Sequence, residues 1–127
     1  MTERPRIERL LGELYAARAA GDLDRLCVLF TPDALFKIEG SSDGKPISIA
    51  ASGEREIRTW LSVLVKSFRI SRYEIASMVI ESPRAAVQWR ASIDSRITGA
   101  SVATELVDMI ETRDGRITSY VELFVPA

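Results

Sequence analysis

The sequence predicts an α+β domain, with three helices in the first half and a sheet of long strands in the second. Three observations predict it. Before residue 69, apolar residues recur at helical spacing in three segments. After it, they alternate with polar residues over four long segments. The chain has 127 residues, 46% of them hydrophobic, so residues 1–127 are expected to form one domain around one core.

Two helices are expected to open the domain. Pro5 suits a first helical turn and Gly21 ends the helix. The apolar stripe of this helix comprises Ile7, Leu10, Leu11, Leu14 and Tyr15. Asp22 can cap a second, shorter helix. Thr31-Pro32-Asp33 is expected to end that helix, because the residue before a proline is disfavoured in helical conformation.

A strand is expected at 34–39 with Phe36 and Ile38 on one face, and a second, short one at 47–51. Ser52 can then cap the third helix. The apolar face of the third helix comprises Ile57, Trp60, Leu61, Leu64, Val65 and Phe68.

Alternation predicts four long antiparallel strands in the second half. They are expected at 70–80, 87–94, 102–112 and 117–125. Arg113-Asp114-Gly115-Arg116 is a hairpin signal between the last two.

Two acids lie on otherwise largely apolar strand faces. Asp108 shares its face with apolar residues, and Glu122 shares its face with Tyr120 and Phe124. A three-residue loop would place Asp108 opposite Tyr120, with the two acids as diagonal neighbours. A two-residue Asp114-Gly115 loop would shift the pairing and separate them.

Paired acids of this kind favour proton-transfer chemistry. A carboxyl group in apolar surroundings has a raised pKa, and a second acid nearby raises it further. Such a pair tends to share one proton, so that one group donates and the other accepts. The alternative is structural: an inward acid hydrogen-bonded to a tyrosine, an arginine or backbone amides.

Composition excludes several mechanisms. The chain has no His, so a Ser-His-Asp triad, a Cys-His pair and a histidine metal site are all excluded. Its one cysteine, Cys27, cannot form an internal disulfide. No cofactor is expected, and no metal, since two carboxylates alone make a poor cage. The net charge of -1 does not favour nucleic acid. Without a long apolar run or a signal segment, no membrane association and a cytoplasmic location are expected.

Short segments in a fixed order resemble the SnoaL-like and ketosteroid-isomerase-like branch of the NTF2-like superfamily over nearly the whole chain. They are Ala19-Ala20-Gly21-Asp22-Leu23-Asp24, Leu29-Phe30-Thr31-Pro32-Asp33-Ala34, Glu56-Ile57-Arg58, Val107-Asp108 and Asp114-Gly115-Arg116-Ile117. The resemblance implies a cone: a strongly curved sheet wrapped around the helices, with a deep apolar pocket between them. It also implies a homodimer through the outer sheet face. That face would include Val107, Met109, Val121 and Leu123.

The resemblance carries the steroid isomerase machinery over only in part. The carboxylate base of those enzymes matches Ile38. Their helix-one tyrosine matches Leu14, with Tyr15 expected to point elsewhere. Their protonated carboxylic acid matches Asp108, and Glu122 is an additional acid. The chain is therefore not expected to be a steroid isomerase by the known mechanism.

The leading interpretation is a protein that binds a small, largely apolar molecule in the cone. The expected lining comprises Leu14, Tyr15, Phe36, Ile38, Trp60, Trp89, Tyr120 and Phe124. Asp108 and Glu122 would fix the ligand and, in an enzyme, serve as acid and base in isomerisation, cyclisation, dehydration or hydrolysis, with Tyr120 orienting one of them. The alternatives are a non-catalytic dimeric binding or assembly module and a nuclear-transport-like adaptor. An open cavity at the acid pair would favour the enzyme, and a sealed cavity filled by Trp60 and Phe124 would exclude the enzyme interpretation.

Overall fold

The computed structural model describes residues 3–42 and 44–126. Its elements are α1 (Glu3–Ala20), α2 (Leu23–Cys27), β1 (Phe30–Ser42), β2 (Lys45–Ser52), α3 (Glu54–Ser67), β3 (Phe68–Glu81), β4 (Arg84–Ser95), β5 (Ser101–Arg113) and β6 (Arg116–Pro126). The predicted α+β class is confirmed. None of the described helices is both long and apolar enough to cross a membrane.

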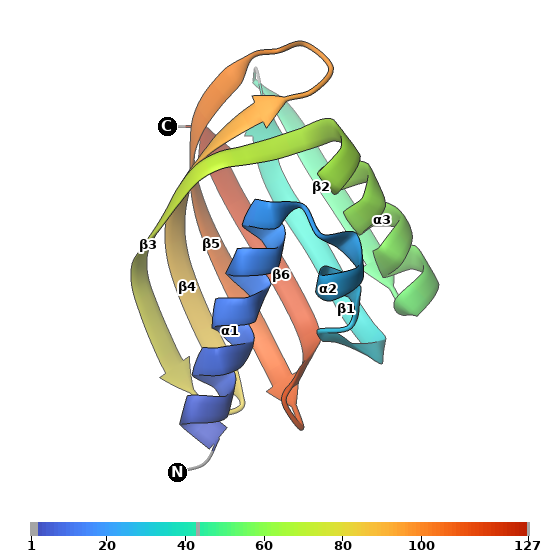
Figure 1. Cartoon of the computed structure of the whole chain (residues 1–127), viewed down its shortest axis with the longest axis vertical. Helices are drawn as coiled ribbons and strands as arrows, with labels where there is room; N and C mark the ends of the chain where they lie inside the picture. Colours follow the sequence, from blue (N-terminus) through green and yellow to red (C-terminus); the bar gives the residue numbers. More distant parts are fainter. Residues whose placement is uncertain (1–2, 43, 127) are drawn as a thin grey trace.

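All six strands form one mixed sheet in the order β2-β1-β6-β5-β4-β3. β1 and β6 are parallel, and every other pair is antiparallel. The sheet curves strongly, and the three helices lie on its concave side (Figure 1). The core fills the space between them, so side chains that point inward from the central strands lie under α1.

The expected apolar stripe of α1 is confirmed. Its five residues are between 0% and 5% exposed, while the polar positions between them face solvent. Burying one such Leu or Ile side chain contributes about 1.5–3 kcal/mol, so this stripe supplies much of the attachment of α1 to the sheet.

Two boundary predictions are wrong. The second helix ends at Cys27, and Thr31-Pro32-Asp33 lies inside β1 instead of terminating the helix. The register of β1 with β6 is irregular between Phe30 and Leu35, so Pro32 occupies a stretch where its missing N–H costs no regular ladder bond.

Ser52 does not cap α3. The N-cap is Gly53, at φ 86°, and no side chain caps it. The Ser52 backbone N–H instead donates to Glu56 Oε1 at 2.9 Å, which ties the end of β2 to the first turn of the helix.

Both registers considered for the β5–β6 hairpin are wrong. The turn contains two residues, Asp114 and Gly115, both with positive φ, and Arg113 pairs with Arg116. Between the turn and the acids, however, β6 contains one extra residue, Thr118, in a bulge. This residue shifts the pairing by one position, so Asp108 lies directly opposite Glu122.

Candidate functional site

The acids belong to one row of inward side chains across the sheet. Glu122 on β6 pairs with Asp108 on β5 and with Ile38 on β1, and Asp108 also pairs with Val87 on β4. Ile38 is 4% exposed and Val87 is 0% exposed, so the two acids lie between apolar neighbours inside the core.

Asp108 is fully buried, and three neutral donor groups lie within hydrogen-bond distance of a single oxygen of its carboxyl group. The Oδ2 atom lies 2.5 Å from the Tyr15 hydroxyl, 3.0 Å from Trp89 Nε1 and 2.8 Å from the Tyr120 hydroxyl. Its other oxygen, Oδ1, is buried without a hydrogen-bond partner among the described residues. Oδ1 is therefore the one carboxyl oxygen of the two acids without a hydrogen-bond partner in the described part of the chain.

Glu122, 3% exposed, is instead paired with a cation. Arg18 Nη1 donates to Glu122 Oε2, and Arg18 Nη2 donates to Oε1 at 3.3 Å. The guanidinium also lies over the Trp89 ring, with Cζ 5.1 Å from the ring centroid. Cation–π contact of this kind holds the charge in place on the apolar side of the site.

Tyr120 connects the two acids. Its hydroxyl lies 2.7 Å from Glu122 Oε2 and 2.8 Å from Asp108 Oδ2, and it accepts a hydrogen bond from Arg18 Nη1 at 2.8 Å. Phe36 stacks on the Tyr120 ring, with centroids 5.5 Å apart. Because a hydroxyl has one proton, Tyr120 can donate to only one acid at a time.

The two acids have opposite pKa shifts. Burial, reinforced by the charge of Glu122, raises the pKa of Asp108 well above its ordinary value of 3.8. Burial alone would also raise the pKa of Glu122, but the charge and hydrogen bonds of Arg18 outweigh it and hold that pKa below 4.5. Of the two acids, Asp108 therefore holds its proton to higher pH, and Glu122 is the one that ionises first.

The structure brings the three predicted catalytic residues, Asp108, Glu122 and Tyr120, together with Tyr15 and Trp89. The expectation that Tyr15 points elsewhere is wrong, since its hydroxyl donates to Asp108. The helix presents both Leu14 and Tyr15 inward, and both are buried.

Two other predicted lining residues lie further from the acids. Phe124 is half-buried beside Gly40 on β1, where an added Cβ would lie 2.5 Å from its ring, so only glycine fits there. Trp60 lies on α3 with 36% of its surface exposed. Their place in a ligand pocket stays a prediction.

The sequence pattern did not identify Arg18 as a residue of the site. This arginine lies four residues after Leu14 and seven after Leu11, so it extends the buried stripe of α1 by one turn. A charged residue at the end of an apolar stripe was the signal that could have identified it.

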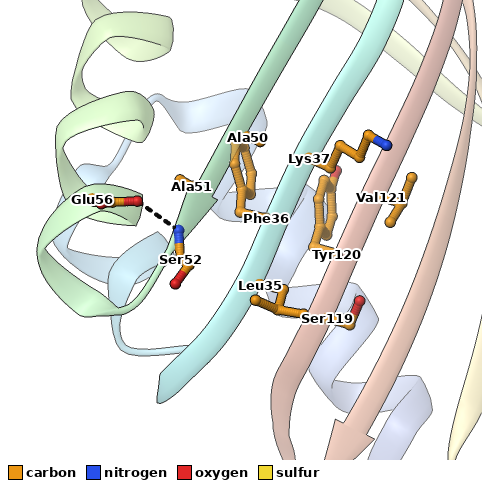
Figure 2. A pocket seen from close by; sticks show the side chains of 10 residues that line it. All are labelled: Leu35, Phe36, Lys37, Ala50, Ala51, Ser52, Glu56, Ser119, Tyr120 and Val121. Carbon is orange, nitrogen blue, oxygen red and sulfur yellow. Dashed lines mark hydrogen bonds between the residues drawn. The ribbon is translucent and has the colours of Figure 1, made fainter.

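Two of the grooves on the surface of the described residues have a defined lining, and neither lining includes Asp108 or Glu122. The larger, about 430 Å³, lies over β1, β2 and β6 (Figure 2). Its lining comprises Leu35, Phe36, Lys37, Ala50, Ala51, Ser52, Glu56, Ser119, Tyr120 and Val121. The acid pair is thus covered in this structure, with Arg18 as its most exposed partner at 16%.

The described part of the chain contains no cluster of candidate metal ligands. Within residues 3–42 and 44–126, no group of three or more Asp, Glu or Cys side chains is placed to hold an ion.

A family model described as the SnoaL-like domain matches residues 11–120. The chain belongs to the SnoaL-like family. This confirms the resemblance to the NTF2-like superfamily. No curated protein sequence matches the chain significantly.

Solved structures share this SnoaL-like fold along nearly their whole lengths. A "Putative Isomerase" from Bacillus subtilis has a TM-score of 0.83 at 21% identity, covering 98% of this chain and 89% of its own. An LEH-like epoxide hydrolase from M. tuberculosis has a TM-score of 0.71 at 16% identity, covering 91% and 80%. An NTF-2 like protein of unknown function from Burkholderia xenovorans LB400 has a TM-score of 0.73 at 18% identity, covering 100% and 88%. At these identities the likeness establishes the fold alone.

Proposed function

We propose that this SnoaL-like protein binds a small, uncharged, largely apolar molecule at the Asp108–Glu122 pair and catalyses proton transfer on it. The observation that carries the proposal is that two buried acids with opposite pKa shifts lie directly opposite each other on adjacent strands. Acid–base catalysis needs one group that holds its proton and one that has lost it, and opposite shifts favour that division.

In the proposed reaction, Asp108, Glu122 and Tyr120 each have one role. Neutral Asp108 is the acid, and its unpartnered Oδ1 is the atom that would meet an oxygen of the ligand. Ionised Glu122 is the base. Tyr120, within hydrogen-bond distance of both acids, can pass a proton between them.

The base need not occupy the position that the resemblance indicates. That position is Ile38, and its direct strand neighbour at the same level of the sheet is Glu122. A carboxylate is therefore available one strand away from the expected site. This displacement separates the proposed chemistry from that of the steroid isomerases.

The charges favour an uncharged ligand. Arg18 and Glu122 cancel, and Asp108 is neutral, so the cluster has no net charge to attract an ion. A buried ion without a partner is costly, whereas a carbonyl or epoxide oxygen needs one donor. Similarity to structures named as an isomerase and an epoxide hydrolase supports trying these two oxygen types first.

A second candidate is a non-catalytic module of the same fold. The burial of the two acids favours this candidate, since Asp108 is 0% exposed and Glu122 is 3% exposed. In that case the acids, Arg18 and the tyrosines form a polar network that specifies the core, and no ligand reaches it.

We also propose that the chain is a homodimer. On the outer face, β5 and β6 expose apolar side chains where a solvated face would be polar, among them Val107, Met109 and Leu123 at 36%, 51% and 44%. A cytoplasmic location remains the expectation.

The deciding experiment is a carboxyl-carbon NMR titration, with Asp108→Asn and Glu122→Gln as assignment variants and Glu111→Gln, an exposed acid of β5, as the control. We expect the pKa of Asp108 to be raised, and to fall when Glu122 is neutralised, because the Glu122 charge is one of its causes. Ketones and epoxides are then added to the wild type. A shift at both acids and turnover lost in both variants supports the enzyme. Normal, independent titrations contradict it, and coupled titrations without a response to any compound favour the module.

A further inference from the structure

Arg18 is the only cation bonded to the acid pair within the described residues, and its contacts are one-sided. It donates to both oxygens of Glu122 and to the Tyr120 hydroxyl, and no hydrogen bond joins it to Asp108. Asp108 receives only neutral donors, from Tyr15, Trp89 and Tyr120. The two carboxyl groups therefore lie in one core with different electrostatic partners.

We propose that Arg18 is the positioning residue of the pair: its guanidinium keeps Glu122 as the carboxylate and leaves the proton on Asp108. This deepens the proposed function and rests on it, because it sets which acid donates and which accepts.

Few groups other than Arg18 lie close enough to Glu122 to set its charge. The titratable groups facing Glu122 are Arg18 and Tyr15 from α1, Asp108 from β5 and Tyr120 from β6. Burial raises the pKa values of both tyrosines above their ordinary value, so they stay neutral and contribute no charge. Two buried acids so close cannot both ionise without a cation. The position of the single positive charge then decides which one does.

The fold holds that charge on the Glu122 side. Arg18 follows Leu14 by one helical turn, so its stem leaves the buried face of α1, and its head rests over Trp89. Trp89 in turn donates to Asp108. The indole thus contacts the guanidinium with its face and the acid with its N–H, so one side chain fixes the position of both groups.

The test compares carboxyl titrations in Arg18→Met, Arg18→Lys and the control Arg9→Met, which removes an exposed arginine of the same helix. Met keeps an apolar stem over Trp89 but no charge. We expect the measured pKa of Glu122 to rise by about one to three pH units in Arg18→Met, the usual effect of an opposite charge at this range. Lysine should restore most of the original value, and Arg9→Met should change nothing. An unchanged Glu122 pKa in folded Arg18→Met overturns the proposal.

A paired comparison covers the case in which Arg18→Met does not fold. Asp108→Asn and the double variant Arg18→Met/Asp108→Asn each keep Glu122 as the one acid of the pair, and only the first retains the cation. Arg18 lowers the pKa of Glu122. That pKa should therefore be higher in the double variant, and equal values contradict the proposal.

This outcome is separate from that of the proposed function. Shifted titrations with no ligand or turnover found would leave Arg18 as the positioning residue of a structural network. Turnover that is lost in the Asp108 and Glu122 variants, with no change on removing Arg18, would keep the function and reject the role of Arg18.

Discussion

Asp108 and Glu122 face each other directly across β5 and β6 because β6 contains one extra residue, Thr118. Counted from the Arg113–Arg116 pair alone, Asp108 would face Val121, whose side chain belongs to the outer face. The bulge restores an inward residue at that position, and Thr118 Oγ1 donates to the Glu111 carbonyl at 3.2 Å. A single residue near the turn thus creates the acid pair.

The pH dependence of stability should differ between wild type and Asp108→Asn. The folded-state pKa of Asp108 is raised, so its contribution to stability is complete below about pH 4 and is lost as pH rises towards the folded value. Asparagine has no such titration. We expect the free energy of unfolding of wild type, relative to Asp108→Asn, to decline by about 1.4 kcal/mol per pH unit across that interval. Urea unfolding at several pH values measures it, and a constant difference would contradict the raised pKa.

Glu122→Gln should be strongly destabilising at neutral pH. The substitution leaves the Arg18 side chain, which is only 16% exposed, without its carboxylate partner. Breaking a buried ion pair in this way costs roughly 3 kcal/mol. The lowered pKa of Glu122 means that wild type loses this contribution as pH falls through the folded value, below 4.5. Adding Arg18→Met to Glu122→Gln should recover much of the loss, as measured by denaturant unfolding. A double variant no more stable than the single one would show that the ion pair is not the cause.

Tyr15→Phe should raise the pKa of Asp108 further. The Tyr15 hydroxyl donates to Asp108 Oδ2 at 2.5 Å and so favours the ionised form. Without that donor, one of the interactions that lower the pKa is lost, and the effect of burial, which raises it, is offset less. Carboxyl NMR detects the change, and Tyr73→Phe, on an exposed tyrosine of β3, is the control. A lower pKa in Tyr15→Phe would mean that the hydroxyl acts on the neutral form instead.

Sedimentation should show that the protein is a dimer and that charged substitutions on the outer face of the sheet disrupt it. We expect wild type at micromolar concentration to sediment at twice the mass of one chain, and Met109→Lys/Leu123→Lys to sediment as a monomer, because lysines would meet across the interface. Val63→Lys, on the exposed side of α3, should remain a dimer. A monomeric wild type would reject the interface.

Local pattern was enough to determine the order of the elements and the buried stripe of α1. The spacing of Ile7, Leu10, Leu11 and Leu14 predicts a helix whatever it packs on, and alternation around Asp108 predicts which way that acid points. The same local pattern placed the side chains of Asp108, Tyr120 and Glu122 on the inward face of the sheet. These features depend on three or four neighbouring residues, which the sequence displays directly.

Only the tertiary structure decided how those faces meet. Whether Asp108 faces Tyr120, Val121 or Glu122 depends on one bulged residue whose position is set by pairing between strands, and no periodicity within β6 reveals it. Likewise, Arg18 joins the site because α1 crosses the sheet at one particular level, which places its last inward turn above Trp89 and Glu122. The sequence by itself determined the order of the elements and the inward direction of Asp108, Tyr120 and Glu122. The register and the helix position determined which charge lies beside which acid, because electrostatic interactions depend on distances between segments far apart in the chain.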